Sequence, residues 1–162
     1  MPPVSHQPAV HAPAANRLRL DGDALVSNWR ALARLGGDAA CGAAVKADGY
    51  GLGARAVVAR LAAAGCRDFF VATWREAAAI ADLVVAHNLS LSVLHGVRAA
   101  DMADALAGPA RPVLNSAEQV ARWRAGGGGA CDVMVDTGMN RLGVSPDEVR
   151  DGLLDGLAIE TL

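Results

Sequence analysis

The sequence lacks the features that mark several large classes of protein. Its 162 residues carry a formal net charge of −2, so no excess of basic residues favours a nucleic-acid partner. No apolar run approaches the roughly 18 residues that cross a membrane, and the N-terminus has no charged region followed by an apolar stretch. We therefore predict a soluble, cytoplasmic protein with neither a nucleic-acid nor a membrane partner.

Cysteine and histidine are too few and too scattered to build a disulfide frame or a metal site. The three cysteines, Cys41, Cys66 and Cys131, are widely spaced, and each lies in or beside an apolar run. This pattern predicts buried free thiols in a reducing compartment. His6 and His11 lie in a segment rich in Pro and Ala, where solvated side chains are the expected state. We predict no metal site.

The sequence does contain enough apolar residues, 52% of the total, for one domain with a core. Residues 1–16 have no hydrophobic periodicity, so we predict a disordered tail there. From residue 17 onward, alternating patterns predict strands and helices in turn. The expected strands are 17–21, 41–46, 68–72, 89–94, 111–115, 130–136 and 157–162, and the helices between them include 54–64, 74–86 and 99–106.

The order of these elements predicts an α/β fold with a parallel sheet. An open doubly wound sheet and an eight-fold barrel both fit the alternation. We favour the (β/α)8 TIM-barrel type, because the candidate site residues gather at strand ends and barrel active sites lie on that face. With about six βα units in residues 17–162, the barrel is expected to be incomplete. The open edges at 41–46 and 157–162 then predict aggregation or dependence on a partner.

The segment 41–53 has the strongest chemical signal. An apolar run of small residues ends at Lys46, and three glycines with Tyr50 between them follow. A lysine at the end of a buried strand is partly desolvated and can react with an aldehyde, and a glycine-rich loop can expose backbone N–H groups to an anion. The alternative is a surface lysine before an ordinary turn.

The run Ala44-Val45-Lys46-Ala47-Asp48-Gly49-Tyr50-Gly51 resembles the lysine signature of the alanine racemases, which use pyridoxal 5'-phosphate. The resemblance implies that Lys46 holds the cofactor covalently and exchanges the Cα proton of the substrate, and that Tyr50 reaches the cofactor phosphate. Cofactor-carrier proteins that also bind pyridoxal phosphate share the first half of this motif.

A second run, 136–143, reads Asp-Thr-Gly-Met-Asn-Arg-Leu-Gly and follows an expected strand. Its Arg141 has the planar guanidinium that suits a carboxylate. The run resembles the second alanine racemase signature, which implies that Arg141 binds the substrate carboxylate. The sequence departs from the family at Met134, where many members have a carbamylated lysine that pairs with this arginine. The orientation of Arg141 must then come from another group or be looser.

Four other side chains lie near expected strand ends or helices. The resemblance implies that Leu94 lies against the cofactor ring, although a core leucine is the alternative. His95 has no second group to pair with, so we expect a polar residue at the rim. Trp74 and Trp123 are expected to lie in the core or to pack between the helices and the barrel.

The resemblance implies an isomerase that interconverts L-alanine and D-alanine and so supplies D-alanine for peptidoglycan. In the family a tyrosine from a partner subunit acts on the second face of the substrate, so a homodimer is implied. Tyr50 is the only tyrosine here, which predicts that these residues alone are inactive. The alternatives are a racemase of another small amino acid, a non-enzymatic pyridoxal-phosphate homeostasis protein, or a half-barrel without a ligand.

Overall fold

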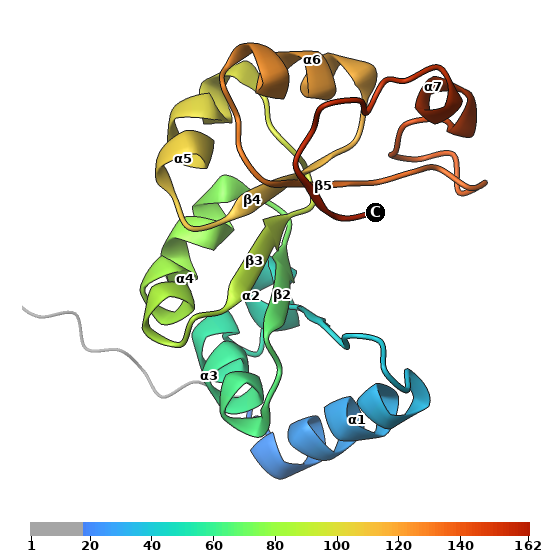
Figure 1. Ribbon diagram of the computed structural model, residues 1–162. Coiled ribbons are helices and arrows are strands. Elements are labelled where there is room, and N and C mark those ends of the chain that lie inside the picture. The colour runs from blue at the N-terminus through green and yellow to red at the C-terminus, as the bar shows by residue number, and fades with distance from the viewer. Residues whose placement is uncertain (1–17) are drawn as a thin grey trace, which may run out of the picture.

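A computed structural model describes residues 18–162, so the predicted tail at 1–16 lies outside the described residues. The elements follow the expected alternation, and Figure 1 shows their arrangement. Their bounds are α1 Gly22–Leu35, β1 Ala43–Ala44, α2 Lys46–Tyr50, α3 Ala54–Ala64, β2 Asp68–Val71, α4 Trp74–Ala86, β3 Ser90–Val93, the 3-10 helix η1 Ala99–Asp101, α5 Met102–Ala107, β4 Arg111–Leu114, α6 Ala117–Ala125, β5 Cys131–Val133, α7 Pro146–Arg150 and β6 Ile159–Thr161.

The six strands form one sheet in the order β1-β2-β3-β4-β5-β6, and every neighbouring pair is parallel. A doubly wound sheet reverses its strand order at a switch point, whereas this sheet always adds the next strand on the same side. Right-handed crossovers then place the connecting helices on one face. Helices α3 to α6 follow that face, and the C-terminus lies on the concave side (Figure 1). The prediction of a partial barrel is confirmed.

The hydrophobic core lies between the strands and the outer helices. Its fully buried side chains include Phe69, Val71, Leu91 and Leu114 from the strands, and Ile80 from α4. Alternate residues of the strands point to the other, inner face of the sheet. Trp74 and Trp123 are 8% and 3% exposed and belong to the core, which confirms that they are packing residues.

The inner face contains a buried charged cluster. Arg111 Nε donates to Asp132 Oδ1 over 2.8 Å, and Ser92 Oγ donates to Asp132 Oδ2 over 2.5 Å. These residues come from three adjacent strands, β3, β4 and β5. The Asp132 carboxylate therefore has a partner on each oxygen, as a buried charge requires.

Two expectations about the first strands are wrong. Residues 18–21 form no strand; Leu18 is 72% exposed, and Asp21 instead caps α1 by accepting from the backbone N–H groups of Asp23 and Ala24. The expected strand at 41–46 is only Ala43–Ala44, extended by one bond from Val45 N to Phe70 O of 2.8 Å. No helix within residues 18–162 is long and apolar enough to cross a membrane.

Candidate functional site

The predicted site residues lie at the carboxyl edge of the parallel sheet. Lys46 directly follows the β1 pairing, Leu94 follows β3, and the run that contains Arg141 follows β5. Parallel strands all end at the same edge, so the fold brings these segments to one rim. Lys46 is half-buried there.

Lys46 begins a turn of left-handed helix, where a glycine-rich loop was expected. Ala47, Asp48 and Gly49 have φ of 52°, 52° and 63°, and Tyr50 has φ of 57°. The bonds from Gly49 N to Val45 O and from Gly51 N to Ala47 O, at 2.8 and 3.0 Å, are the i to i−4 bonds of a helix. The left-handed region costs an L-residue ~1–2 kcal/mol, so three non-glycine residues store about 3–6 kcal/mol of strain.

Contacts outside the turn hold it in this conformation. The N–H of Ala47 donates to Glu76 Oε1 over 2.9 Å, and the Asp48 carboxylate accepts from Ala54 N over 2.8 Å. Gly49 is buried against α3, and a Cβ at that position would lie 3.1 Å from Ala54 N. The strain is therefore balanced by tertiary contacts, a feature of functional sites.

Tyr50 is the last residue of the turn that Lys46 begins, and its side chain is accessible. The Tyr50 side chain is 63% exposed. All six ion pairs within residues 18–162 use arginine, and none of the hydrogen bonds of these residues includes the Lys46 amine. The amine and the phenol are thus both free to meet a ligand at this rim.

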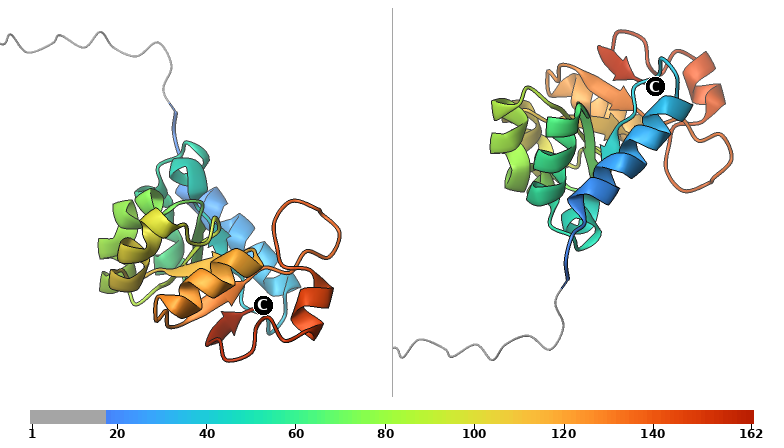
Figure 2. Two further views of the ribbon diagram at one scale, coloured as in Figure 1. Left: turned by 90° about the horizontal axis from the view of Figure 1, so that it is seen from above. Right: turned by 90° about the horizontal axis from the view of Figure 1, so that it is seen from below.

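The run 136–143 forms a loop that its first residue organises. Asp136 Oδ1 accepts from Gly138 N at 2.9 Å and from Asn140 N at 3.1 Å. These bonds, the one from Gly138 first, lower the pKa of the Asp136 carboxyl. The ends of the loop meet at an isolated bridge between Val135 and Val144. The loop projects from the molecule in both views of Figure 2.

Arg141 lies in the exposed part of this loop. No hydrogen bond or ion pair joins its guanidinium to Lys46 or to another residue within 18–162. Met134, two residues before Asp136, is half-buried on the strand side of the loop. Asp136 therefore shapes the backbone of the loop that carries Arg141, while no group among the described residues orients the guanidinium itself.

Leu94 lines a hollow of about 720 Å³ on the inner face of the sheet. Most of the lining side chains are apolar; they are Phe70, Leu94, Val113, Asp132, Val133, Met134, Val135, Thr137, Pro146, Val149, Arg150, Thr161 and Leu162. Such a hollow suits a flat apolar ring. His95, beside Leu94, is exposed, as expected for a rim residue.

Sequence reasoning missed two residues at this edge. Asn115 follows β4 and is 4% exposed; its amide donates to Leu94 O over 2.9 Å, while its Oδ1 has no hydrogen-bond partner among the described residues. Glu76, which contacts the lysine turn, belongs to a capping box with Thr73. The Thr-x-x-Glu spacing is visible in the sequence and predicts that cap, but nothing in it predicts the contact with the turn.

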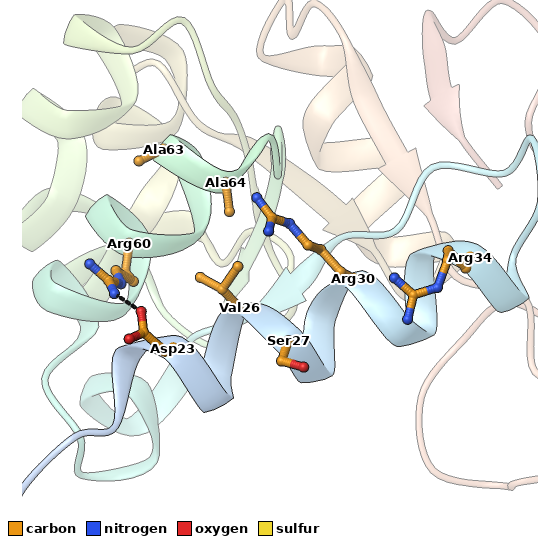
Figure 3. A pocket seen from close by; sticks show the side chains of 8 residues that line it. All are labelled: Asp23, Val26, Ser27, Arg30, Arg34, Arg60, Ala63 and Ala64. Atoms are coloured by element: carbon orange, nitrogen blue, oxygen red, sulfur yellow. Dashed lines mark hydrogen bonds and ion pairs between the residues drawn. The ribbon is translucent and has the colours of Figure 1, made fainter.

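A basic groove of about 550 Å³ lies away from this edge, between α1 and α3 (Figure 3). Arg60 pairs with Asp23 at one end of it, and Arg30 extends from α1 toward α3. Its α3 residues come from the last half of that helix, whereas Ala54, at the start of α3, contacts the lysine turn. The groove is therefore separate from the candidate site. Within residues 18–162, His, Cys, Asp and Glu form no group of three that could hold a metal.

The family to which this chain is similar covers nearly all of the residues that the structure describes. Residues 20–159 match the family described as alanine racemase, N-terminal domain. The chain is 47% identical over 143 residues to an alanine racemase from Rhodospirillum rubrum and 43% identical over 152 residues to one from Acidiphilium cryptum. These matches cover 85% and 88% of this chain but only 38% and 42% of the relatives, so the chain spans about two fifths of their length.

Solved structures show the same architecture. A crystal structure of alanine racemase from Bartonella henselae with covalently bound pyridoxal phosphate has a TM-score of 0.72 and 33% identity, over 81% of this chain and 38% of that one. A histidine racemase from Leuconostoc mesenteroides, at 22% identity and a TM-score of 0.68 over 82% of this chain and 37% of that one, shares the fold. The match over residues 20–159 and the curated relatives give the same family as the two sequence runs that resemble its signatures. This chain therefore belongs to the alanine racemase N-terminal domain family.

Proposed function

We propose that this chain is the cofactor-binding part of an alanine racemase, a pyridoxal-phosphate enzyme that interconverts L-alanine and D-alanine and supplies D-alanine for peptidoglycan. The curated relatives that it matches are named alanine racemase. The chain spans about two fifths of their length, so the proposal concerns a protein that includes this chain. We expect residues 1–162 alone to bind the cofactor without racemising alanine.

The observation that carries the proposal is the state of Lys46. It lies half-buried at the carboxyl edge of the sheet, and its amine is free of hydrogen bonds and ion pairs among the described residues. It is also the single lysine of the sequence. Among the described residues every ion pair uses arginine, and the one lysine amine stays free at a parallel-sheet edge, where it is a nucleophile suited to an aldehyde.

The surrounding residues fit pyridoxal phosphate. Tyr50 extends an accessible hydroxyl from the same turn as Lys46, and this hydroxyl can donate to a phosphate oxygen. Leu94 lines an apolar hollow beside the strand ends, which suits the pyridine ring. Lys46 would hold the aldehyde carbon, Tyr50 the phosphate and Leu94 one face of the ring.

When bound, pyridoxal phosphate supplies an electron sink for the carbanion formed at Cα of an amino acid. The Lys46 amine would take or return the Cα proton on its own face of the substrate. Arg141 binds the substrate carboxylate through its planar guanidinium, and Asp136 keeps the loop of Arg141 in shape. Tyr50 anchors the phosphate and so keeps Cα within reach of the Lys46 amine.

Racemisation also needs a proton-transfer group on the opposite face of the substrate. Tyr50 is the single tyrosine of the sequence and already has a phosphate role in this proposal. We propose that the second group comes from a partner subunit of a homodimer. The free state of Cys41, Cys66 and Cys131 supports a reducing, cytoplasmic setting.

The test is covalent capture of the cofactor. The purified chain is incubated with pyridoxal phosphate, its visible absorption is recorded, and borohydride reduction followed by peptide mass mapping locates the adduct. Because the sequence has one lysine, the proposal expects a single side-chain adduct, at Lys46. Lys46→Ala removes the amine, and Lys46→Arg keeps the positive charge without a reactive amine. An unmodified Lys46 in the parent, or equal absorption in both variants, would reject the proposal.

Two alternatives are separated by a second measurement. A protein that contains this chain and the remaining length of its relatives is assayed with L-alanine, L-serine and L-histidine. Racemisation of alanine supports the proposal, and preference for another amino acid identifies a different racemase. Capture of the cofactor without racemisation of any of them indicates a carrier, although the Asp-Thr-Gly-Met-Asn-Arg run argues for an enzyme.

A further inference from the structure

The carboxylate of Glu76 joins three backbone segments at the carboxyl edge of the sheet. Its Oε1 accepts from Ala47 N over 2.9 Å, and its Oε2 accepts from Ala72 N over 2.7 Å and from Thr73 N over 3.2 Å. Ala47 is the first left-handed residue after Lys46, and Ala72 directly follows β2. Glu76 therefore connects the lysine turn to the end of β2 and the start of α4.

The turn depends on this contact because its own hydrogen bonds leave the N–H of Ala47 unused. In the turn, the N–H groups of Gly49 and Gly51 donate to Val45 O and Ala47 O. Asp48 holds the exit of the turn through Ala54 N, at 2.8 Å, and Glu76 holds the entrance. Without Glu76 the N–H of Ala47 loses its acceptor, and the strained residues can relax toward the right-handed region that L-residues prefer.

Such relaxation would move Tyr50 relative to Lys46, because the residues between the two side chains are the left-handed ones. Lys46 itself is anchored from its N-terminal side by the β1 pairing and by the bond of Val45 N to Phe70 O at 2.8 Å. The amine would stay near its place while the phenol shifts. Only a ligand that uses both groups would be affected.

We infer that Glu76 is a positioning residue that sets the distance between the Lys46 amine and the Tyr50 hydroxyl, and that it thereby selects an aldehyde with a phosphate group. This inference rests on the proposed function, since it takes pyridoxal phosphate as the ligand. Glu76 itself acts through the backbone N–H of Ala47. Substitution of Glu76 should therefore weaken the part of the binding that the phosphate contributes. The reaction of the Lys46 amine with an aldehyde should stay unchanged.

The chain provides a matched control at α7. Glu148 forms the same capping box with Ser145, where its Oε2 accepts from Ser145 N over 2.7 Å. Its hydrogen bonds stay within that cap, and none reaches the turn at 46–50. In both variants an amide NH2 replaces one acceptor oxygen. At Glu148 this perturbs only the helix cap, whereas at Glu76 the single remaining oxygen can no longer accept from both Ala47 N and Ala72 N. Thr73→Ala is a second control, because it removes the side chain that caps α4 while Glu76 stays in place.

The experiment measures dissociation constants for pyridoxal phosphate and for pyridoxal, which has the same aldehyde without the phosphate. The parent and the three variants are titrated and followed by visible absorption. In Glu76→Gln we expect the constant for pyridoxal phosphate to rise about tenfold, the effect of one lost charge-assisted hydrogen bond, and the constant for pyridoxal to change less than about twofold. Glu148→Gln and Thr73→Ala should leave the ratio of the two constants at the parent value.

Amide hydrogen exchange of the peptide 46–53 gives a readout that needs no cofactor. Glu76→Gln should speed exchange in this peptide, and Glu148→Gln should not. Unchanged exchange in Glu76→Gln would overturn the inference. Faster exchange in Glu76→Gln, together with the parent's ratio of the dissociation constants for pyridoxal phosphate and pyridoxal, would also overturn it. If the parent captures pyridoxal phosphate, these outcomes reject the role of Glu76 alone. If the parent captures neither aldehyde, the proposed function fails and this inference fails with it.

Discussion

The buried pair of Arg111 and Asp132 on the inner face of the sheet predicts a large effect of a single substitution. The Asp132 side chain is 4% exposed and the Arg111 side chain 24% exposed. Arg111→Met keeps an unbranched apolar stem but removes the guanidinium, so the carboxylate stays buried with only the Ser92 hydroxyl as a partner. Breaking a buried ion pair on one side costs about 3–5 kcal/mol. Because Arg111 is partly exposed, we expect the lower value, a loss of about 3 kcal/mol in the free energy of unfolding.

A second substitution separates the cost of the unpaired charge from the cost of lost packing. Asp132→Asn removes the negative charge and keeps an oxygen that can accept from Ser92. In the double variant Arg111→Met/Asp132→Asn no charge remains buried, and we expect stability within about 1 kcal/mol of the parent. The coupling between the two sites should then be about 2 kcal/mol or more.

Urea unfolding measures these differences. Trp74 and Trp123 are buried, so their fluorescence reports the loss of the core. The slope with denaturant should stay constant across the variants, which shows that stability and not compactness has changed. A loss below about 1 kcal/mol in Arg111→Met, or a double variant as unstable as the sum of the two single variants, would refute the electrostatic reasoning.

Three further predictions concern the thiols and the loop at 136–143. Burial raises the pKa of the Cys66 thiol from 9.0 to about 11, so in this range the folded state keeps a proton that the unfolded state loses. The free energy of unfolding should therefore fall as pH rises from 9.0 to about 11, and Cys66→Ala should remove that decline. Iodoacetamide at neutral pH should label the half-buried Cys41 before the buried Cys66. Asp136→Ala removes the acceptor that shapes the loop, so trypsin should cut after Arg141 several-fold faster, as intact-mass analysis would show. Gly143→Ala should lower stability by more than about 1 kcal/mol in urea unfolding, because φ there is +125° and a Cβ would lie 2.5 Å from Asp136 N.

The sequence predicted the bounds of two helices correctly. The bounds of α3 and α4 match the expected 54–64 and 74–86, and Thr73 caps α4 as its position suggested. Strands were predicted in the right order but too long. The expected strand at 130–136 is β5 Cys131–Val133, because the chain after it departs toward the bridge of Val135 with Val144.

The geometry of the site was less predictable than its residues. Lys46, Tyr50 and Arg141 were named from motifs, and the structure places their segments at one edge of the sheet. The left-handed turn could not be predicted, because alanine and tyrosine disfavour that region in isolation. Contacts from outside the turn hold it, and one of them, from Ala47 N to Glu76, reaches 29 residues further along the chain.

The expected strand at 17–21 failed for a related reason. Its alternation of charged and apolar residues is a property of the local sequence, but a strand forms only beside another strand. Within the described residues, 18–21 have no strand neighbour, and Leu18 is exposed. The local sequence pattern predicts which face of a segment is apolar. It does not predict whether another part of the chain supplies the neighbouring strand that a strand requires.

The left-handed turn after β1 limits how the segment with Lys46 and Tyr50 can be reused in protein engineering. Residues 44–53 transplanted into another parallel barrel would carry the amine and the phenol but not their spacing, since the turn depends on an acceptor supplied by α4. A designer would have to graft the acidic side chain with the peptide, or build positions 47 and 48 from glycine or D-amino acids, which enter that region without strain. The transferable unit is therefore a pair of segments from consecutive βα repeats.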